Sequence, residues 1–271
     1  MKVLLFANTD WYLFNFRRSL AHSLRDAGYE VVLLSPPGEY GPRLQEMGFR
    51  WIPAPLDRRS LNPLRELAFV LWLRRLLVAE KVDLVHGFTI KCAVYGSIAG
   101  RLAGVSGRVN AVAGMGYVFT SDAPKARLLR PVVRSLMRYS LDGRNARLIL
   151  QNPDDVALFE RARIVDRQHI RLIPGSGVDC RRFLPRPAGG EVAAGQGLFR
   201  VVLPARLLWD KGVAEYVEAA RRLLAQGRSI EFLLAGSPDP GNPAAVPEEQ
   251  VRTWVAEGTV TWLGHVADMP G

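Results

Sequence analysis

Two cations follow a short apolar segment in the last third of the sequence. Residues Phe199 to Ala205 have the composition of a buried strand and a helical pattern starts at Gly212, so that Arg206 and Lys211 lie in the turn between them. In open α/β sheets ligands bind beyond the carboxyl ends of the strands, and a helix N-terminus attracts anions. An arginine fork binds two phosphate oxygens at once, and a lysine adds a point charge. The pattern therefore indicates a diphosphate site, with two ordinary surface cations as the alternative.

Strand-like and helix-like segments alternate along the whole chain. The sequence predicts strands at residues 3–7, 30–35, 49–54, 82–86, 108–113, 146–151, 170–173, 199–205, 230–235 and 260–263. It predicts helices at 14–27, 41–47, 63–80, 93–103, 125–141, 212–226 and 248–257, and one more that begins after Asn152. Asn62-Pro63 and Asn152-Pro153 have the order of cap and first-turn proline that is typical of helix starts. The alternation predicts an α/β fold with parallel sheets covered by helices on both faces.

A segment rich in proline and glycine divides this pattern into two domains. We expect an N-terminal Rossmann-like domain at residues 1–187, a linker at 188–198 and a second domain at 199–271. The second domain has only three predicted strands, whereas a doubly wound domain usually has about five or six. We therefore expect two doubly wound, Rossmann-like domains, of which the second is incomplete because the chain is truncated.

Short motifs in a fixed order resemble those of a known family. Ala205-Arg206-Leu207 with Lys211-Gly212-Val213 and Glu215 has the form of the donor-phosphate segment of retaining GT-B glycosyltransferases of the family 4 type. Further matching segments are 15–17 (NFR), 85–91 (VHGFTIK), 114–119 (GMGYVF), 151–155 (QNPDD), 175–179 (GSGVD), 234–236 (LAG) and 263–266 (LGHV). The chain is most similar to members that extend a sugar on undecaprenyl diphosphate, such as bacterial N-acetylgalactosaminyltransferases.

The resemblance implies a GT-B fold and a role for individual residues. It implies that Arg206 and Lys211 are catalytic, because they would hold the donor diphosphate and stabilise the departing nucleotide. It assigns Gly177 and Gly236 to the donor site, and it assigns Arg17, Lys91, Gly114, Gly116 and Tyr117 to the acceptor site. It also implies that His86 lines the cleft as a third catalytic residue, although a strand-end histidine with satisfied hydrogen bonds is an equal alternative.

The implied activity is transfer of a sugar from a nucleotide-sugar, a UDP-sugar above all, to a lipid-linked or glycan acceptor with retention. Such enzymes assemble cell-surface polysaccharides and glycans. The family's E-x7-E motif, which binds the donor sugar and ribose, would lie beyond Gly271, so we expect this chain to be inactive alone. Two alternatives stay open: a non-catalytic fragment that binds acceptor or membrane, and a nucleotide-sugar 2-epimerase, which has the same two-domain fold.

The basic charge of the chain indicates an anionic partner. Lys and Arg number 36 against 26 Asp and Glu, a net charge of +10, although Arg-rich coding would have the same effect. Between Lys125 and Arg147 there are seven basic residues and one acid, and Arg127, Arg130, Arg134 and Arg138 recur at helical spacing. A cationic amphipathic helix is typical of anionic membrane surfaces, and the Leu67–Val78 segment with its two arginines supports this reading. An ordinary solvated helix is the alternative.

Several expected absences complete the sequence-based prediction. The chain has no D-x-D, so we expect no metal, and no G-x-G-x-x-G after the first strand, so we expect no dinucleotide cofactor. It has no recognisable nucleic-acid-reading module, so we expect no nucleic acid partner. Two cysteines without a CxxC fit a reducing compartment, and the apolar runs are too short to span a bilayer. We therefore expect a cytoplasmic protein, peripheral on the inner face of the membrane.

Overall fold

The chain forms two units. The computed structural model describes residues 1–58, 60, 62–112, 124–180, 183–184, 198–239, 242–266 and 269, with only the backbone of 124–130. Unit 1 is Met1–Val178 and unit 2 is Asp179–Gly271, and each is a separate compact body. The predicted linker at 188–198 lies almost wholly outside the described residues, so the predicted domain boundaries stay a prediction.

Unit 1 contains a seven-stranded sheet with the order β3-β2-β1-β4-β5-β6-β7. The strands are β1 (Lys2–Phe6), β2 (Glu30–Ser35), β3 (Arg50–Pro53), β4 (Leu84–Phe88), β5 (Gly107–Val112), β6 (Ala146–Leu150) and β7 (Ile170–Leu172). All six neighbouring pairs are parallel, as the predicted βαβ units require. The order reverses between β1 and β4, and at such a switch point the loops at the carboxyl ends of the strands diverge and leave room for a ligand.

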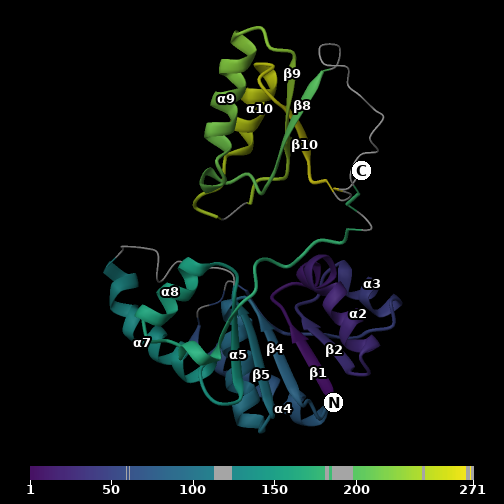
Figure 1. Ribbon diagram of the computed structural model, residues 1–271, viewed down its shortest axis with the longest axis vertical. Coiled ribbons are helices and arrows are strands. Elements are labelled where there is room, and N and C mark those ends of the chain that lie inside the picture. The colour runs from purple at the N-terminus through teal and green to yellow at the C-terminus, as the bar shows by residue number, and fades with distance from the viewer. Residues whose placement is uncertain are drawn as a thin grey trace. The chain divides into compact units, whose positions relative to one another are not determined.

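Helices cover both faces of this sheet (Figure 1). They are α1 (Asp10–Tyr12), the π-helical turn η1 (Leu13–Arg17), α2 (Arg18–Asp26), α3 (Tyr40–Glu46), α4 (Pro63–Ala79), α5 (Ile90–Ala103), α7 (Pro124–Leu141), α8 (Pro153–Arg161) and the 3-10 turn η2 (Arg167–His169). Along β1, Val3 and Leu5 pack with the η1, α2 and α3 layer. Leu4 and Phe6 point the other way and pack with α4 and α5. This alternation gives the doubly wound fold that the sequence predicted.

The first helical segment differs from its prediction at 14–27. It begins at Asp10, because the Thr9 hydroxyl accepts a hydrogen bond from the Tyr12 amide at 3.0 Å and starts the helix early. The segment then passes through the π turn η1 before α2 ends at Asp26. The fourth strand also runs two residues further than predicted, because the parallel ladder continues to Phe88, which pairs with Ala111. His86 therefore lies inside β4, and the prediction of a strand-end histidine was wrong.

Unit 2 contains three parallel strands, as predicted, and they form a sheet with the order β10-β9-β8. Its elements are β8 (Phe199–Pro204), the 3-10 turn η3 (Trp209–Lys211), α9 (Val213–Ala225), β9 (Ile230–Ala235), α10 (Glu248–Ala256) and β10 (Thr261–Gly264). Both α9 and α10 lie on the same side of the sheet (Figure 1). Within the described part of unit 2, the other face exposes Val202 and Leu263, so here the expected helix layers on both faces are reduced to one.

In the part of the chain that the structure describes, no helix is both long and apolar enough to cross a membrane.

Candidate functional site

The two cations of the predicted diphosphate site lie at the carboxyl end of β8. Arg206 follows β8 directly, and its Nη1 lies 2.8 Å from Oδ2 of Asp239, with 63% of the arginine side chain exposed. Lys211 is exposed at the end of η3, immediately before α9. Gly212 begins α9 in the left-handed conformation (φ 74°) and contributes no side-chain cap. The turn between β8 and α9 therefore contains two exposed cations and the free first-turn N–H groups of a helix, a combination suited to phosphate oxygens.

Gly236 packs closely against the backbone of Ala205, the residue before Arg206. Its N–H donates to the Gly264 carbonyl at 2.7 Å, and the neighbouring Ala235 carbonyl accepts from Ala205 at 3.1 Å. A Cβ atom at position 236 would overlap the Ala205 carbonyl oxygen. Only glycine lets the three strand ends meet this closely, so Gly236 fixes the backbone next to Arg206, while its role in donor binding stays a prediction.

Gly177, the other predicted donor residue, is exposed in the turn after β7. It belongs to unit 1, whereas Arg206, Lys211 and Gly236 belong to unit 2.

In unit 1, Arg17 and His86 lie together at the β1–β4 switch point. The Arg17 guanidinium lies 4.5 Å from the centre of the Phe88 ring, and its Nη2 donates to the Tyr12 hydroxyl at 2.6 Å. The His86 ring contacts the same Phe88, with ring centres 4.2 Å apart. Burial, with the Arg17 charge adding to it, lowers the pKa of His86 to about 3. The imidazole is therefore neutral at physiological pH and can both donate and accept a hydrogen bond.

This cluster contains polar atoms that lack partners. Nε of Arg17 and Nε2 of His86 are buried, and neither has a hydrogen-bond partner in the described structure. Thr89 is buried at its hydroxyl and adopts a left-handed φ of 69°, which costs a β-branched residue more than most. The Cys92 thiol interacts with the Thr89 hydroxyl, but a thiol is a weak hydrogen-bonding partner. Unsatisfied buried polar groups and backbone strain both concentrate at ligand sites, and here they coincide.

Lys91 of α5, a predicted acceptor residue, forms hydrogen bonds with helix α4 and with the loop that precedes α4. Its Nζ donates to the carbonyls of Asp57 at 2.7 Å and Ser60 at 2.9 Å, and to Oε1 of Glu66 at 3.0 Å. These bonds use all three N–H donors of the ammonium group. The role of Lys91 in acceptor binding stays a prediction, and the geometry adds a structural role that the sequence did not indicate.

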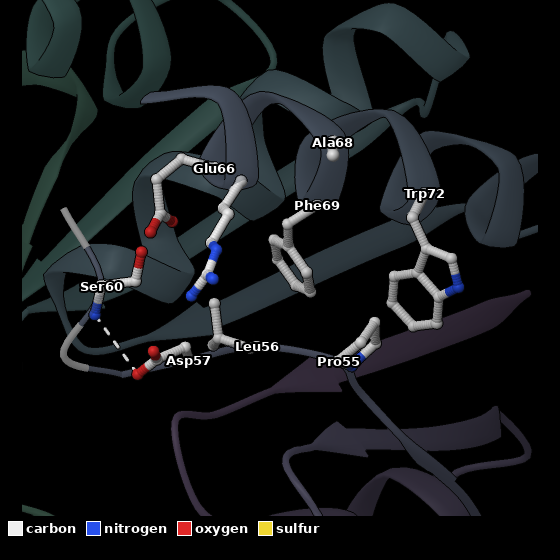
Figure 2. A pocket seen from close by; sticks show the side chains of 9 residues that line it. Pro55, Leu56, Asp57, Ser60, Glu66, Ala68, Phe69 and Trp72 are labelled. Carbon is white, nitrogen blue, oxygen red and sulfur yellow. Dashed lines mark hydrogen bonds between the residues drawn. The ribbon is translucent and has the colours of Figure 1, made fainter. Parts of the chain in front are cut away.

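A pocket of about 440 Å³ lies beside this loop. Figure 2 shows the Phe69 and Trp72 rings of α4 on one wall, Pro55 and Leu56 opposite, and Ser60 and Glu66 at one end. The two aromatic rings stack with centres 5.6 Å apart. The pocket is therefore apolar along its length and polar at one end.

Three further predicted acceptor residues, Gly114, Gly116 and Tyr117, lie outside the described residues. The sequence analysis missed Tyr12, Phe88 and Thr89. A signal for the first was present, since four aromatic residues occur between Trp11 and Phe16, directly after the first strand. Phe88 and Thr89 lie in the matching segment 85–91, but within that segment the resemblance assigns a role to His86 and Lys91 alone. The contacts of Phe88 with Tyr12 and Arg17 join positions far apart in the sequence.

Comparison with known proteins identifies the family. The model of the glycosyl transferase 4-like domain matches residues 15–176, more than half of the chain. The chain belongs to this glycosyltransferase family.

Relatives and solved structures agree with this assignment. The chain is 28% identical over 267 residues to an N,N'-diacetylbacillosaminyl-diphospho-undecaprenol alpha-1,3-N-acetylgalactosaminyltransferase of Campylobacter jejuni, covering 95% of this chain and 68% of the relative. It is 28% identical to a UDP-Gal:alpha-D-GlcNAc-diphosphoundecaprenol alpha-1,3-galactosyltransferase of Escherichia coli, covering 61% and 43%. The fold is similar to Anabaena HepE bound to UDP-glucose, with a TM-score of 0.67, 18% identity, and 100% and 70% coverage. The predicted GT-B glycosyltransferase fold is thereby confirmed.

The low pKa of His86 predicts a pH dependence for the stability of this glycosyltransferase. In the unfolded chain His86 binds a proton as the pH falls below 6.5, whereas in the folded protein it stays neutral until the pH falls to about 3. Stability should therefore drop as the pH falls through this window, by about 1.4 kcal/mol per pH unit from this group. Urea unfolding at pH 7, 6, 5 and 4 measures how the free energy of unfolding changes with pH. The variant His86→Gln should lack the part of this change that His86 contributes. A variant with the same slope as the unchanged glycosyltransferase would contradict the prediction.

The Lys91 contacts predict a large structural effect of its removal. Lys91→Met leaves the Glu66 charge without its ion-pair partner and two carbonyls without their donor in a partly buried place, so the free energy of unfolding should fall by about 3 kcal/mol. Arg222→Met is the matched control, because Arg222 pairs with Glu218 at 2.7 Å on an exposed helix face. Its loss should cost less than about 0.5 kcal/mol. Equal losses in the two variants would show that Lys91 is not a structural residue of this glycosyltransferase.

Proposed function

We propose that this glycosyltransferase moves a sugar from a UDP-sugar to a lipid-diphosphate-linked acceptor, with retention of the anomeric configuration. The observation that carries the proposal is the pair of exposed cations, Arg206 and Lys211, at the uncapped N-terminus of α9. Family membership supports the reaction class, and the names of the two relatives support the choice of acceptor. The UDP-glucose in the Anabaena structure supports the choice of donor.

On this proposal, unit 2 binds the donor through its phosphates. Arg206 takes two phosphate oxygens with the N–H groups that Asp239 leaves free, Lys211 adds a second charge, and the α9 amides complete the site. As the bond to the sugar breaks, negative charge grows on the departing diphosphate. Fixed donors that face this charge stabilise the transition state more than the ground state. We propose that these side chains supply the positive charge without a metal, which predicts activity that persists in the presence of EDTA.

Unit 1 would bind the acceptor at the switch point. Arg17, the neutral His86 and the Thr89 hydroxyl offer a cation, an imidazole and a hydroxyl whose buried atoms have no strong protein partner in the described structure, since the hydroxyl has only the weak Cys92 thiol beside it. Sugar hydroxyls and phosphate oxygens would satisfy them, and so relieve the cost of leaving buried polar groups unpaired. Gly114, Gly116 and Tyr117 are proposed to complete this side of the site.

The same unit has a surface suited to an anionic membrane. Leu64, Leu67 and Leu71 of α4 are exposed by 78%, 56% and 43%, and they form a stripe at helical spacing. Arg65, Arg74 and Arg75 flank this stripe. The acid within α4, Glu66, faces Lys91 instead. In an interfacial helix, leucines enter the headgroup region and arginines pair with lipid phosphates, and α4 has residues of both kinds in this arrangement.

The described part of α7 has a similar surface. Val132 and Leu136 are exposed beside Arg134 and Arg138. Since α5 packs against both α4 and α7, all three helices lie on one side of the sheet. We propose that this side lies on the inner face of the cytoplasmic membrane, with the apolar pocket of Figure 2 beside the hydrocarbon of the acceptor.

Vesicle binding tests the membrane surface. The protein should co-sediment with anionic vesicles, and salt should release it because charge pairing is screened. The double variant Leu67→Ser with Leu71→Ser should lower the partition about tenfold or more, since two apolar anchors are lost. A matched change on unit 2, Val255→Ser, is the control, because Val255 is 41% exposed. Equal binding to neutral and anionic vesicles would overturn the electrostatic part of this proposal.

A transfer assay tests the reaction itself, and with it the expectation from the sequence that this chain is inactive alone. The protein is incubated with UDP-N-acetylgalactosamine or UDP-galactose and an N-acetylhexosaminyl-diphospho-lipid, and the product linkage is determined by NMR. The proposal predicts an α-linked disaccharide from the α-linked donor. A β-linked product would overturn retention. Binding of UDP without any transfer would favour the alternative of a fragment that binds its substrates but does not turn them over.

The 2-epimerase alternative is less well supported. An epimerase acts on the nucleotide-sugar alone, so it needs neither an acceptor site nor a membrane surface. The leucine stripe of α4 and the unpartnered polar groups at the switch point would then have no role. Conversion of a UDP-sugar to its 2-epimer in the absence of acceptor would reverse this preference.

A further inference from the structure

Two aromatic side chains are exposed where β1 ends. Trp11 and Phe16 each have 40% of their surface in contact with solvent. Their rings meet edge to face, with centres 5.3 Å apart and planes at 74°. Single exposed apolar residues are common on protein surfaces, but an exposed aromatic pair at the carboxyl edge of a parallel sheet lies where ligands bind.

The pair is attached to a rigid part of the backbone. Asp10 is buried and accepts hydrogen bonds from the amides of Trp11 at 2.8 Å, Tyr40 at 2.8 Å and Gly41 at 2.9 Å. The Asn15 side chain closes the turn by donating to the Trp11 carbonyl at 3.0 Å. A surface that is already ordered loses little conformational entropy when it binds a ligand.

A continuous series of rings connects this pair to the polar cluster at the switch point. Phe16 contacts Tyr12 at 5.4 Å between ring centres, Tyr12 contacts Phe88 at 5.9 Å, and Phe88 contacts His86 at 4.2 Å. The exposed rings of Trp11 and Phe16 are therefore connected by ring contacts to the buried polar groups without partners. An apolar surface next to a few recessed hydrogen-bonding groups is the usual composition of a small-molecule site.

We propose that Trp11 and Phe16 form a platform on which a pyranose ring of the acceptor packs. A pyranose presents C–H groups on its faces and hydroxyls around its rim, so it matches both the rings and the polar groups behind them. The inference rests on the proposed function, because it assigns a sugar-bearing acceptor to unit 1. Two rings next to the polar Asn15 and Arg17 offer little area to a bilayer, and the leucine stripe of α4 is the larger apolar surface.

The test compares two soluble probes that differ only in the sugar. One is N-acetylglucosaminyl diphosphate with a short alkyl tail, and the other is the same alkyl diphosphate without the sugar. Trp11→Ala should weaken the sugar-bearing probe about tenfold, as loss of a stacking ring does, and leave the sugarless probe unchanged. Trp11→Phe should restore binding to within about threefold, because a ring remains. Tyr139→Ala removes another exposed aromatic residue of unit 1 and is the control.

Each outcome decides the proposal. Equal weakening of both probes, or no weakening, would overturn the platform while leaving UDP binding and transfer intact. Failure of the unchanged protein to bind the sugar-bearing probe would overturn the platform and the acceptor assignment together. If Trp11→Ala instead releases the protein from anionic vesicles and leaves the sugar probe unaffected, the pair is a membrane contact. Thermal unfolding of each variant shows whether a loss reflects misfolding, and Phe16→Leu repeats the test at the second ring.

Discussion

Replacing Arg206 with alanine should weaken UDP binding between about tenfold and a hundredfold, and so should replacing Lys211. A hydrogen bond to a charged group contributes about 1.5–3 kcal/mol, and each 1.4 kcal/mol is a factor of ten. In a transfer assay the loss in kcat should be larger, about a hundredfold to a thousandfold, because the charge that the two residues face grows in the transition state. Isothermal calorimetry with UDP and steady-state kinetics measure the two effects.

Unit 2 provides a matched control for this prediction. Arg200 lies near the other end of the same strand, is 70% exposed and pairs with Glu231 at 2.9 Å, much as Arg206 pairs with Asp239. Arg200→Ala therefore removes the same charge and one ion pair from the opposite edge of the sheet, and UDP binding should not change. Equal weakening by Arg200→Ala and Arg206→Ala would show that only net charge matters, and the diphosphate site would then be wrongly placed.

A second test of the diphosphate site comes from a substitution of Asp239. Its carboxylate orients Arg206, but it also competes with a phosphate for the guanidinium. Asp239→Asn should therefore raise UDP affinity a few-fold at low salt, with less effect at high salt, because the repulsion between two anions is screened.

Gly236→Ala should be the most damaging single substitution in unit 2. The new methyl group would overlap the Ala205 carbonyl, which is backbone and cannot rotate away as a side chain could. We expect a loss of more than about 3 kcal/mol in the free energy of unfolding, together with the loss of UDP binding, because the Arg206 backbone must shift. Hydrogen exchange at the Ala205 and Gly236 amides should accelerate, since both donate across the affected strand ends.

Gly258→Ala separates this steric effect from the cost of glycine's backbone. Gly258 has a left-handed φ of 71°, and a Cβ atom there would meet open space. The substitution should cost only about 1–2 kcal/mol, which is the strain of the left-handed conformation, and leave UDP binding unchanged. If Gly236→Ala proved as mild as Gly258→Ala, the close approach of the strand ends would not control the site.

The sequence carries enough information for the framework because the framework depends on local signals. Asn62 and Asn152 cap their helices as predicted, each with its side chain bonded to a first-turn amide. The apolar runs at 30–35 and 230–235 become strands with the predicted bounds. The position of Arg206 and Lys211 follows from the same reasoning, since it needs only the end of a strand and the start of a helix.

The unpredicted features depend on residues far apart in the chain. Lys91 bonds to carbonyls more than thirty residues away, and spacing alone cannot reveal such partners. The overlap that makes Gly236 obligatory involves Ala205, which directly follows the neighbouring strand β8. The π turn from Leu13 to Arg17 is hidden for another reason, because only three helical residues, Asp10–Tyr12, precede it, and so short a segment does not show a shift in the apolar pattern.

That π turn has a consequence for the switch point. A π turn contains one residue more than the α-helical turn that it replaces, and it is less stable than the helix that it interrupts. Removing one residue would restore the α-helix and change the rotation of the two sides of the turn by about 100°, so that Arg17 would leave the Phe88 ring and Phe16 would turn away from Trp11. The shorter chain would fold more firmly and would lose the aromatic and cationic face of the switch point. The π turn thus places the aromatic and cationic groups of this face at a cost in helix stability, an exchange often found where a protein meets its ligand.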